Sequence, residues 1–123
     1  MEWTIVNYDS LMDNIKRIHF IGIGGSGMCP LAEILHHEGY ELSGSDMNEG
    51  ETLDRIKGYG IPVFMGHAAE NIKGAELVVY SAAVKETNPE RQAAKELGIP
   101  CIERSVMLGI VTRRYRRCIG VSG

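Results

Sequence analysis

The sequence lacks any uninterrupted apolar run of the ~18 residues that a membrane-spanning helix needs. Its first 15 residues carry Glu2, Asp9 and Asp13 in place of the basic and then apolar pattern of a secretory signal. We therefore expect a cytoplasmic protein with no membrane partner. With 44% hydrophobic and 24% charged residues, the composition is typical of a globular domain and excludes a disordered tail.

Cysteine is scarce, because Cys29, Cys101 and Cys118 are odd in number, far apart and in no C-x-x-C arrangement. This pattern disfavours a disulfide framework or a zinc site and favours small buried thiols in a reducing compartment. The chain also lacks a metal-spaced ligand cluster, a pair of catalytic carboxylates and a recognisable Ser-His-Asp set. The adjacent His36 and His37 would point about 100° apart on a helix and cannot chelate one metal ion by themselves. The sequence therefore predicts no metal site and no catalytic residues.

Acidic residues are missing from one end of the chain. Residues 104–123 hold five arginines and no acid, whereas residues 1–103 hold all 16 acids beside eight bases. Residues 113–117 (RRYRR) combine arginines with an aromatic residue, a pattern that can bind a nucleic-acid backbone. However, the acidic remainder would repel a polyanion, and cations are favourable at the C-terminal end of a helix. We predict a solvated helix end and no nucleic-acid partner.

Glycine is in excess, with 15 in 123 positions, about 12% against a usual ~7%. Many positions must therefore turn tightly or approach another group closely. Apolar runs of strand length alternate with helical patterns of about ten residues, which is the sequence form of a parallel sheet covered by helices. We predict a Rossmann-like, doubly wound α/β fold with a mainly parallel sheet of five or six strands and helices on both faces.

The expected elements follow one another without an internal linker or repeat, so residues 1–123 are predicted to form one domain with a core over residues 15–120. Strands are expected at residues 18–23, 40–45, 62–65, 77–80, 101–102 and 118–121. Helices are expected around residues 9–14, from residue 28 to a cap at residue 39, at residues 51–58, from a cap at residue 88 to residue 98, and at residues 106–113.

The most informative motif is the stretch at residues 22–27 (GIGGSG), a G-x-G-x-x-G between a predicted strand and a predicted helix. Glycines there let the chain turn sharply and let backbone N–H groups approach a diphosphate at the positive end of the helix dipole. Gly25 is an additional glycine that removes further bulk. The alternative is a tight turn that holds no ligand.

Two further segments would meet this loop in a 3-2-1-4-5 strand order. Asp46 follows the second strand, 19 residues beyond Gly27, where a carboxylate can accept hydrogen bonds from ribose hydroxyls. The alternative for Asp46 is a local Asx turn. Residues 81–83 (SAA) follow the fourth strand and would face the glycine loop, although Ser81 could instead simply begin a loop.

Two histidines have different expected roles. His67 follows the third strand, at the ligand end of the sheet, and could reach a base or a sugar. His19 lies within a buried strand and is expected to serve packing.

Five segments of the chain form a distinctive combination. They are residues 18–34 (IHFIGIGGSGMCPLAEI), 43–46 (SGSD), 63–67 (VFMGH), 79–90 (VYSAAVKETNPE) and 121–123 (VSG). Together they resemble the N-terminal domain of the Mur ligases over about residues 17–123. The resemblance is greatest to members that join L-alanine to UDP-N-acetylmuramate in peptidoglycan synthesis. The recycling members, which attach a tripeptide to the same nucleotide sugar, are a near alternative.

The resemblance implies that the domain binds the UDP part of UDP-N-acetylmuramate. The diphosphate would lie on the glycine loop, the ribose or uracil would meet the residues after the second and third strands, and the segment after the fourth strand would form the opposite wall. Arg104 is a weaker candidate near the sugar. The candidate residues are Gly24, Gly25, Ser26, Gly27, Met28, Asp46, His67, Ser81, Ala82, Ala83 and Arg104.

The resemblance also implies where ATP and magnesium act. In Mur ligases ATP phosphorylates the substrate carboxylate, and the amine of L-alanine then attacks the acyl phosphate. The ATP-binding P-loop would begin at Gly123, so we expect ATP, magnesium and the amino acid to bind central and C-terminal domains that this chain does not contain. The chain itself would then need no cofactor and would bind nucleotide sugar without ligating it.

Two other classes stay open. A glycine loop and an acid such as Asp46 serve a nicotinamide or adenine dinucleotide equally well, as in a regulatory NAD(P)-binding domain or the front of a dehydrogenase. An interaction domain without a ligand is the third possibility.

Overall fold

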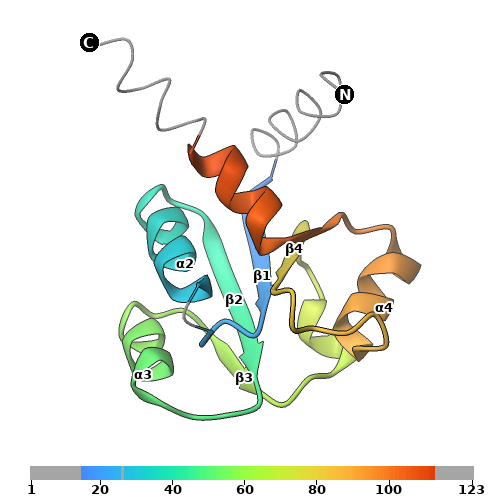
Figure 1. Cartoon of the computed structure of the whole chain (residues 1–123), viewed down its shortest axis with the longest axis horizontal. Helices are drawn as coiled ribbons and strands as arrows, with labels where there is room; N and C mark the ends of the chain where they lie inside the picture. Colours follow the sequence, from blue (N-terminus) through green and yellow to red (C-terminus); the bar gives the residue numbers. More distant parts are fainter. Residues whose placement is uncertain (1–14, 26, 113–123) are drawn as a thin grey trace, which may run out of the picture.

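A computed structural model describes residues 15–25 and 27–112 of the chain. Five parallel strands form one sheet in the order β3-β2-β1-β4-β5 (Figure 1). The strands are β1 (Arg17–Ile21), β2 (Glu41–Asp46), β3 (Val63–Met65), β4 (Leu77–Tyr80) and β5 (Cys101–Glu103). The predicted α/β fold class and strand order are confirmed.

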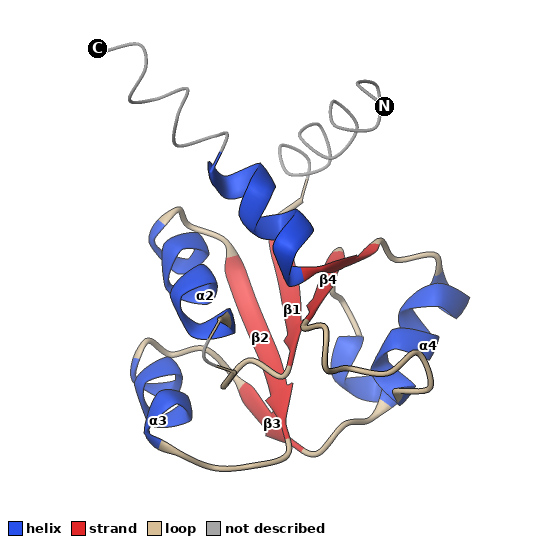
Figure 2. Ribbon diagram, viewed as in Figure 1, coloured by secondary structure: helices blue, strands red, loops and turns tan. Residues whose placement is uncertain are grey.

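Helices cover both sides of this sheet, as predicted (Figure 2). The α-helices are α2 (Met28–His37), α3 (Glu51–Gly58) and α4 (Pro89–Leu97), with a short 3-10 helix η1 (Ala69–Ile72) and a helical segment at residues 104–112. We call the side covered by α2, α3 and residues 104–112 the apolar face, and the side covered by α4 and η1 the polar face.

Local sequence explains where α4 begins and ends. Asn88 caps the helix, its side chain accepting a hydrogen bond from the backbone N–H of Glu90 at 2.8 Å, and Pro89 occupies the first helical position. Gly98 ends the helix with a left-handed φ of 73°, a conformation that glycine adopts without strain.

Two boundaries differ from the sequence prediction by two residues, and several others differ by one residue. β1 ends at Ile21 rather than Ile23, because Gly22 turns the chain with a φ of 81°. The last described helix begins at residue 104, two residues before the predicted start at Val106. Ile23 is nevertheless fully buried, which explains why it continued the apolar pattern of the strand.

Side chains of β1 alternate between the two faces. Ile18 and Phe20 belong to a large hydrophobic cluster on the apolar face. Ile21 belongs to a small cluster on the polar face with Ile72, Val78, Ala93 and Ala94. β2 alternates in the same way, and its Gly44 lies so close to Ile23 that an added Cβ would be 2.6 Å from that side chain. The apolar face therefore has no room for a side chain at this position.

Some predicted features lie outside the described residues. They are the helix around residues 9–14, Ser26, the arginine cluster at residues 113–117, the strand at residues 118–121 with Cys118, and Gly123. Cys29 is buried, as predicted for a small apolar side chain, whereas Cys101 is only half-buried, and both are free thiols. Within the described ranges, no helix is both long enough and apolar enough to cross a bilayer.

Candidate functional site

The carboxyl ends of the five parallel strands lie along one side of the sheet, which we call the carboxyl edge. The strands there are followed by the glycine loop after β1, Asp46 at the end of β2, His67 after β3, Ser81 after β4 and Arg104 after β5. β1 and β4 are neighbours, and the helices that follow them, α2 and α4, cover opposite faces. Ligands of doubly wound sheets bind at such a switch point.

The glycine loop turns tightly over the end of β2. The N–H groups of Gly22 and Ile23 both donate to the carbonyl of Ser45, at 2.8 and 3.1 Å. The N–H of Gly25 donates to the carbonyl of Gly22 at 3.0 Å, and the N–H of Met28 donates to that of Gly25 at 2.9 Å. A ligand phosphate would therefore compete with these backbone carbonyls for the N–H groups of Gly25 and Met28.

Asp46 holds the loop in this shape. Its Oδ2 accepts a hydrogen bond from the N–H of Gly24 at 2.9 Å, and its Oδ1 accepts from Met47 and Asn48, which is an Asx turn. A Cβ on Gly24 would be 2.9 Å from Oδ2 and 3.0 Å from Leu53. A side chain at Gly24 would therefore displace the Asp46 carboxylate or Leu53. The structure brings Asp46 and the loop together as the sequence predicted.

Arg104 reaches the start of α2 from the far edge of the sheet. An added Cβ on Gly27 would be 2.9 Å from Nε and 3.0 Å from Cζ of Arg104, so the guanidinium group lies directly against this glycine. Helix α2 has no acid in its first turn and no side-chain cap. A guanidinium group beside the positive end of a helix dipole gives this point of the edge a positive potential, which suits an anion.

Ser81 and Met28 also lie at this loop. Ser81 Oγ would be 3.9 Å from a Cβ on Gly22, so the segment after β4 approaches the glycine loop from the second strand of the switch point. Ala82 and Ala83 beside it are exposed. The Met28 side chain is buried in the core on the apolar face, so only its backbone is available to a ligand.

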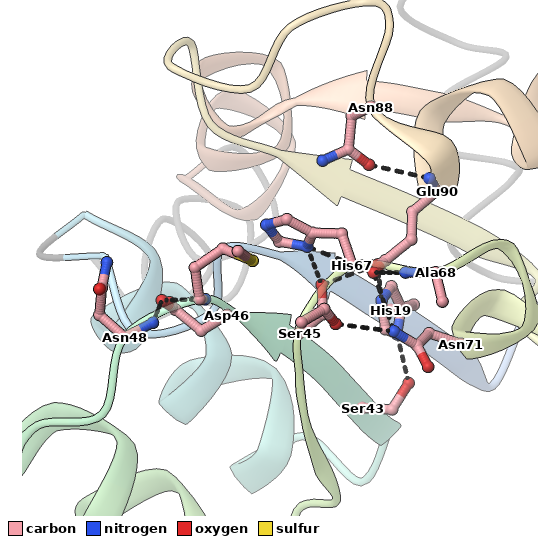
Figure 3. Close-up of polar contacts among 12 residues, drawn as sticks. His19, Ser43, Ser45, Asp46, Asn48, His67, Ala68, Asn71, Asn88 and Glu90 are labelled. Carbon is pink, nitrogen blue, oxygen red and sulfur yellow. Dashed lines mark hydrogen bonds and ion pairs between the residues drawn. The ribbon is translucent and has the colours of Figure 1, made fainter.

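A buried carboxylate on the polar face was missed by sequence reasoning. Glu90 is fully buried, and its Oε1 accepts hydrogen bonds from His19 Nε2 at 2.6 Å and from Ser45 Oγ at 2.7 Å (Figure 3). Its Oε2 accepts from the N–H of Ala68 at 3.1 Å and from Asn71 Nδ2 at 3.0 Å. Burial by itself would raise the pKa of Glu90, but the hydrogen bonds from His19, Asn71 and Ser45 outweigh it and lower the pKa to about 2.

Both histidines of interest belong to this network. His19 is fully buried, and besides Glu90 it meets Ser43, its partner in the β1–β2 register, with Nδ1 and Oγ 2.8 Å apart. His67 Nδ1 lies 2.9 Å from Ser45 Oγ and 3.3 Å from Glu90 Oε2. His19 therefore does more than pack, and a histidine inside an otherwise apolar strand was the signal that a buried polar partner exists.

Metal binding finds no support among the residues that the structure describes. No group of three or more His, Cys, Asp or Glu side chains there is placed to hold a metal ion. Gly123, the predicted start of the ATP-binding loop, is outside the described ranges.

Comparison with known protein families identifies the group to which this fold and loop belong. The model of the Mur ligase family, catalytic domain, matches residues 17–116. The chain belongs to the Mur ligase family. The resemblance predicted from the five sequence segments is confirmed.

Individual Mur ligases agree with this assignment. A UDP-N-acetylmuramate–L-alanine ligase of Legionella pneumophila is 50% identical over 112 residues, which are 91% of this chain and 24% of that protein. The UDP-N-acetylmuramate-alanine ligase structure from Thermotoga maritima has a TM-score of 0.77 and 34% identity, covering 80% of this chain and 23% of that one.

A Mur ligase structure of different specificity is also similar. The UDP-N-acetylmuramate:L-alanyl-gamma-D-glutamyl-meso-diaminopimelate ligase from Neisseria meningitides has a TM-score of 0.68 and 32% identity, covering 73% of this chain and 29% of that one. The chain spans about a quarter of the length of the curated relatives it matches.

Proposed function

We propose that this chain binds the UDP part of UDP-N-acetylmuramate, as the N-terminal domain of an ATP-dependent ligase that adds L-alanine in peptidoglycan synthesis. The observation that carries the proposal is the placement of the Arg104 guanidinium group against Gly27, at the N-terminus of α2. This pairing suits a diphosphate. The 50% identity to a UDP-N-acetylmuramate–L-alanine ligase supports this choice of nucleotide sugar.

In this proposal, different parts of the nucleotide contact residues at the carboxyl ends of different strands. The diphosphate contacts Arg104 and the loop made by Gly24, Gly25, Ser26, Gly27 and Met28. The ribose or uracil contacts Asp46 and His67, which stand at the ends of β2 and β3. Residues 81–83 form the opposite wall.

In the whole ligase this domain anchors the substrate far from the reacting atoms. Anchoring positions the lactyl carboxylate for phosphorylation and lets distant binding energy favour the transition state. ATP and magnesium act in other parts of the protein, beginning with the loop at Gly123. The 123 residues alone are expected to bind in the cytoplasm without ligating, and to need no nucleic acid or membrane.

Titration calorimetry tests the ligand. The chain should bind UDP-N-acetylmuramate and UDP and should give no heat with NAD at the same concentrations. Binding of NAD without a response to either uridine ligand would overturn the proposal in favour of a dinucleotide-binding domain. The 32% identity to the Neisseria structure also allows a ligase that adds the tripeptide. Supplying either L-alanine or the tripeptide to the intact enzyme tests which of the two it ligates.

Arg104→Gln tests the placement of the diphosphate. Loss of a hydrogen bond to a charged group, typically about 1.5–3 kcal/mol, should weaken UDP binding roughly 10- to 100-fold and leave uridine unaffected. Arg55→Gln on α3, an arginine whose side chain is 65% exposed, is the matched control. Gly27→Val should weaken UDP binding as well, because its side chain would displace Arg104 and fill the space of the diphosphate.

Phosphate release tests the expected inactivity. Release of phosphate by the 123 residues that depends on ATP and L-alanine would show that this part of the proposal is wrong.

A further inference from the structure

The hydrogen-bond directions around Glu90 are determined by its charge. An ionised carboxylate can only accept hydrogen bonds. His19 Nε2, 2.6 Å from Oε1, must therefore carry a hydrogen and donate it. Ser45 Oγ, 2.7 Å from the same oxygen, likewise donates its single hydrogen to Glu90.

This direction fixes what Ser45 can do for His67. Because its hydrogen is used on Glu90, Ser45 Oγ can only accept from His67 Nδ1, which lies 2.9 Å away. The second group facing Nδ1 is Glu90 Oε2 at 3.3 Å, which is also an acceptor. Both neighbours of Nδ1 are acceptors, so Nδ1 carries the ring hydrogen.

In the neutral imidazole ring, the other nitrogen of His67 then carries a lone pair. A neutral imidazole with hydrogen on Nδ1 is an acceptor at Nε2. Figure 3 shows this nitrogen pointing away from Glu90, and the His67 side chain is 19% exposed at the carboxyl edge. Glu90 itself cannot shift easily, because Ala68 and Asn71 hold its other oxygen and Asn88 holds its backbone.

We propose that Glu90, acting directly and through Ser45, is a positioning residue that fixes His67 as the Nδ1–H tautomer and presents Nε2 as an acceptor to a hydrogen-bond donor of the bound nucleoside. This inference rests on the proposed function. The donor is a neutral N–H or O–H group, which a uridine nucleotide offers as the imide N–H of uracil or as a ribose hydroxyl. The carboxyl edge thus selects an anion at Gly27 and a neutral donor at His67.

Glu90→Gln is the decisive substitution. Glutamine has one carbonyl oxygen and one NH₂ group, so it cannot accept at both positions. If the NH₂ group takes the place of Oε2, it faces His67 Nδ1 directly. If it takes the place of Oε1, it donates to Ser45, whose hydrogen then turns toward Nδ1. Either orientation favours a hydrogen on Nε2 instead.

Nitrogen-15 NMR of the imidazole rings reads the tautomer directly. At a pH of about 8.5, where imidazole is ordinarily neutral, His67 of the wild-type chain should show only the Nδ1–H form. Glu90→Gln should populate the Nε2–H form. Ser45→Ala should do so in part, since only the 3.3 Å contact to Glu90 remains, and it serves if Glu90→Gln does not fold.

Ser43→Ala is the matched control. Ser43 is also on β2 and also contacts a histidine Nδ1, but that histidine is His19. This variant should leave the tautomer of His67 unchanged. An Nε2–H form in the wild-type chain, or an unchanged Nδ1–H form in both folded Glu90→Gln and Ser45→Ala, would overturn the proposal.

Binding of UDP analogues then identifies the donor. We expect either 3-methyl-UDP, which lacks the imide N–H, or 2′-deoxy-UDP, which lacks a ribose hydroxyl, to bind the wild-type chain about three- to tenfold more weakly than UDP. Glu90→Gln should lose that discrimination. Equal discrimination in both chains would overturn the role of Glu90. If the wild-type chain binds no uridine ligand, the proposed function fails, and the imidazole spectra still support or overturn the positioning of His67.

Discussion

The two faces of the sheet use the same strands but different chemistry. On the apolar face, β1 contributes Ile18 and Phe20 to a large cluster made only of hydrophobic residues. On the polar face His19, which lies between these two residues in the strand, is just as fully buried and contacts Glu90. The first face gains stability by removing apolar surface from water. On the polar face each buried polar group needs a hydrogen-bond partner. Two of these groups, Ser45 and Glu90, also contact His67 at the carboxyl edge.

Removing Phe20 should be the most damaging change to the apolar face. Phe20→Ala leaves a cavity in the large cluster and should lower the free energy of unfolding by about 3–5 kcal/mol, measured by urea denaturation. Phe64→Ala on β3 is the control, because Phe64 is 41% exposed and should cost much less. Equal losses in the two variants would break the contrast between a packed interior and the sheet edge.

Acid should weaken the polar face specifically. The pKa of Glu90 is about 2, below the 4.5 that is usual for a glutamate side chain, so its contribution to stability is present above pH 4.5 and is lost as the pH falls toward 2. That shift corresponds to a contribution on the order of 3 kcal/mol. Urea unfolding of the wild-type chain and Glu90→Gln, at pH 6 and then in steps down to pH 3, should show the difference between them shrinking across this window.

The comparison of these two chains isolates Glu90 from other acids. The pKa of Glu76 is also lowered, by the backbone N–H groups of Lys16 and Arg17, and its effect falls in the same pH range. Because Glu76 is present in both chains, its effect cancels in the difference. A difference that does not change with pH would mean that Glu90 is not held as a carboxylate.

Gly44→Ala should have a smaller effect on the apolar face. Its Cβ would be 2.6 Å from Ile23, and such overpacking typically costs about 1–3 kcal/mol in the free energy of unfolding. Urea denaturation measures the loss, and no loss would show that Ile23 can move aside.

Gly58→Ala should give the smallest effect, and of opposite sign. Apart from its chain neighbours and the backbone of its own helix, no atom lies within 4 Å of the Cβ that it would add on α3, so the variant should be stabilised by about 0.5–1 kcal/mol in the same urea experiment. It is the control for Gly44→Ala, and a loss here would mean that replacing glycine is costly wherever it occurs.

The fold was predictable because its signals are local. Strand-length apolar runs, the Asn88 cap and the Gly98 end each lie within a few residues of the boundary they define, and α3 and β4 have the predicted bounds. The proximity of Asp46 to the glycine loop was predictable as well, since strand order places the ends of β1 and β2 side by side. The end of β1 was wrong by two residues because Ile23 leaves the strand and still packs against Gly44.

The polar face was not predictable in the same way. His19 and Glu90 are 71 residues apart, and neither position in the sequence indicates the other. Arg104 was only a weak candidate, since its approach to Gly27 depends on how the helix after β5 is placed. Local patterns determine elements, but contacts between distant elements decide which polar side chains meet.

The alternation along β1 also bears on how the strands align during folding. A slip of one residue in strand register moves each side chain to the other face of the sheet. When both faces are apolar, such a slip costs little, because one apolar side chain replaces another. In this chain such a slip would place His19 among the aliphatic residues of the large cluster and would leave the Glu90 carboxylate facing Phe20 or Ile18. An unpartnered buried charge is far more costly than a poor apolar contact. The hydrogen bond between His19 and Glu90 therefore favours the native register of β1, because it can form only when His19 lies on the polar face.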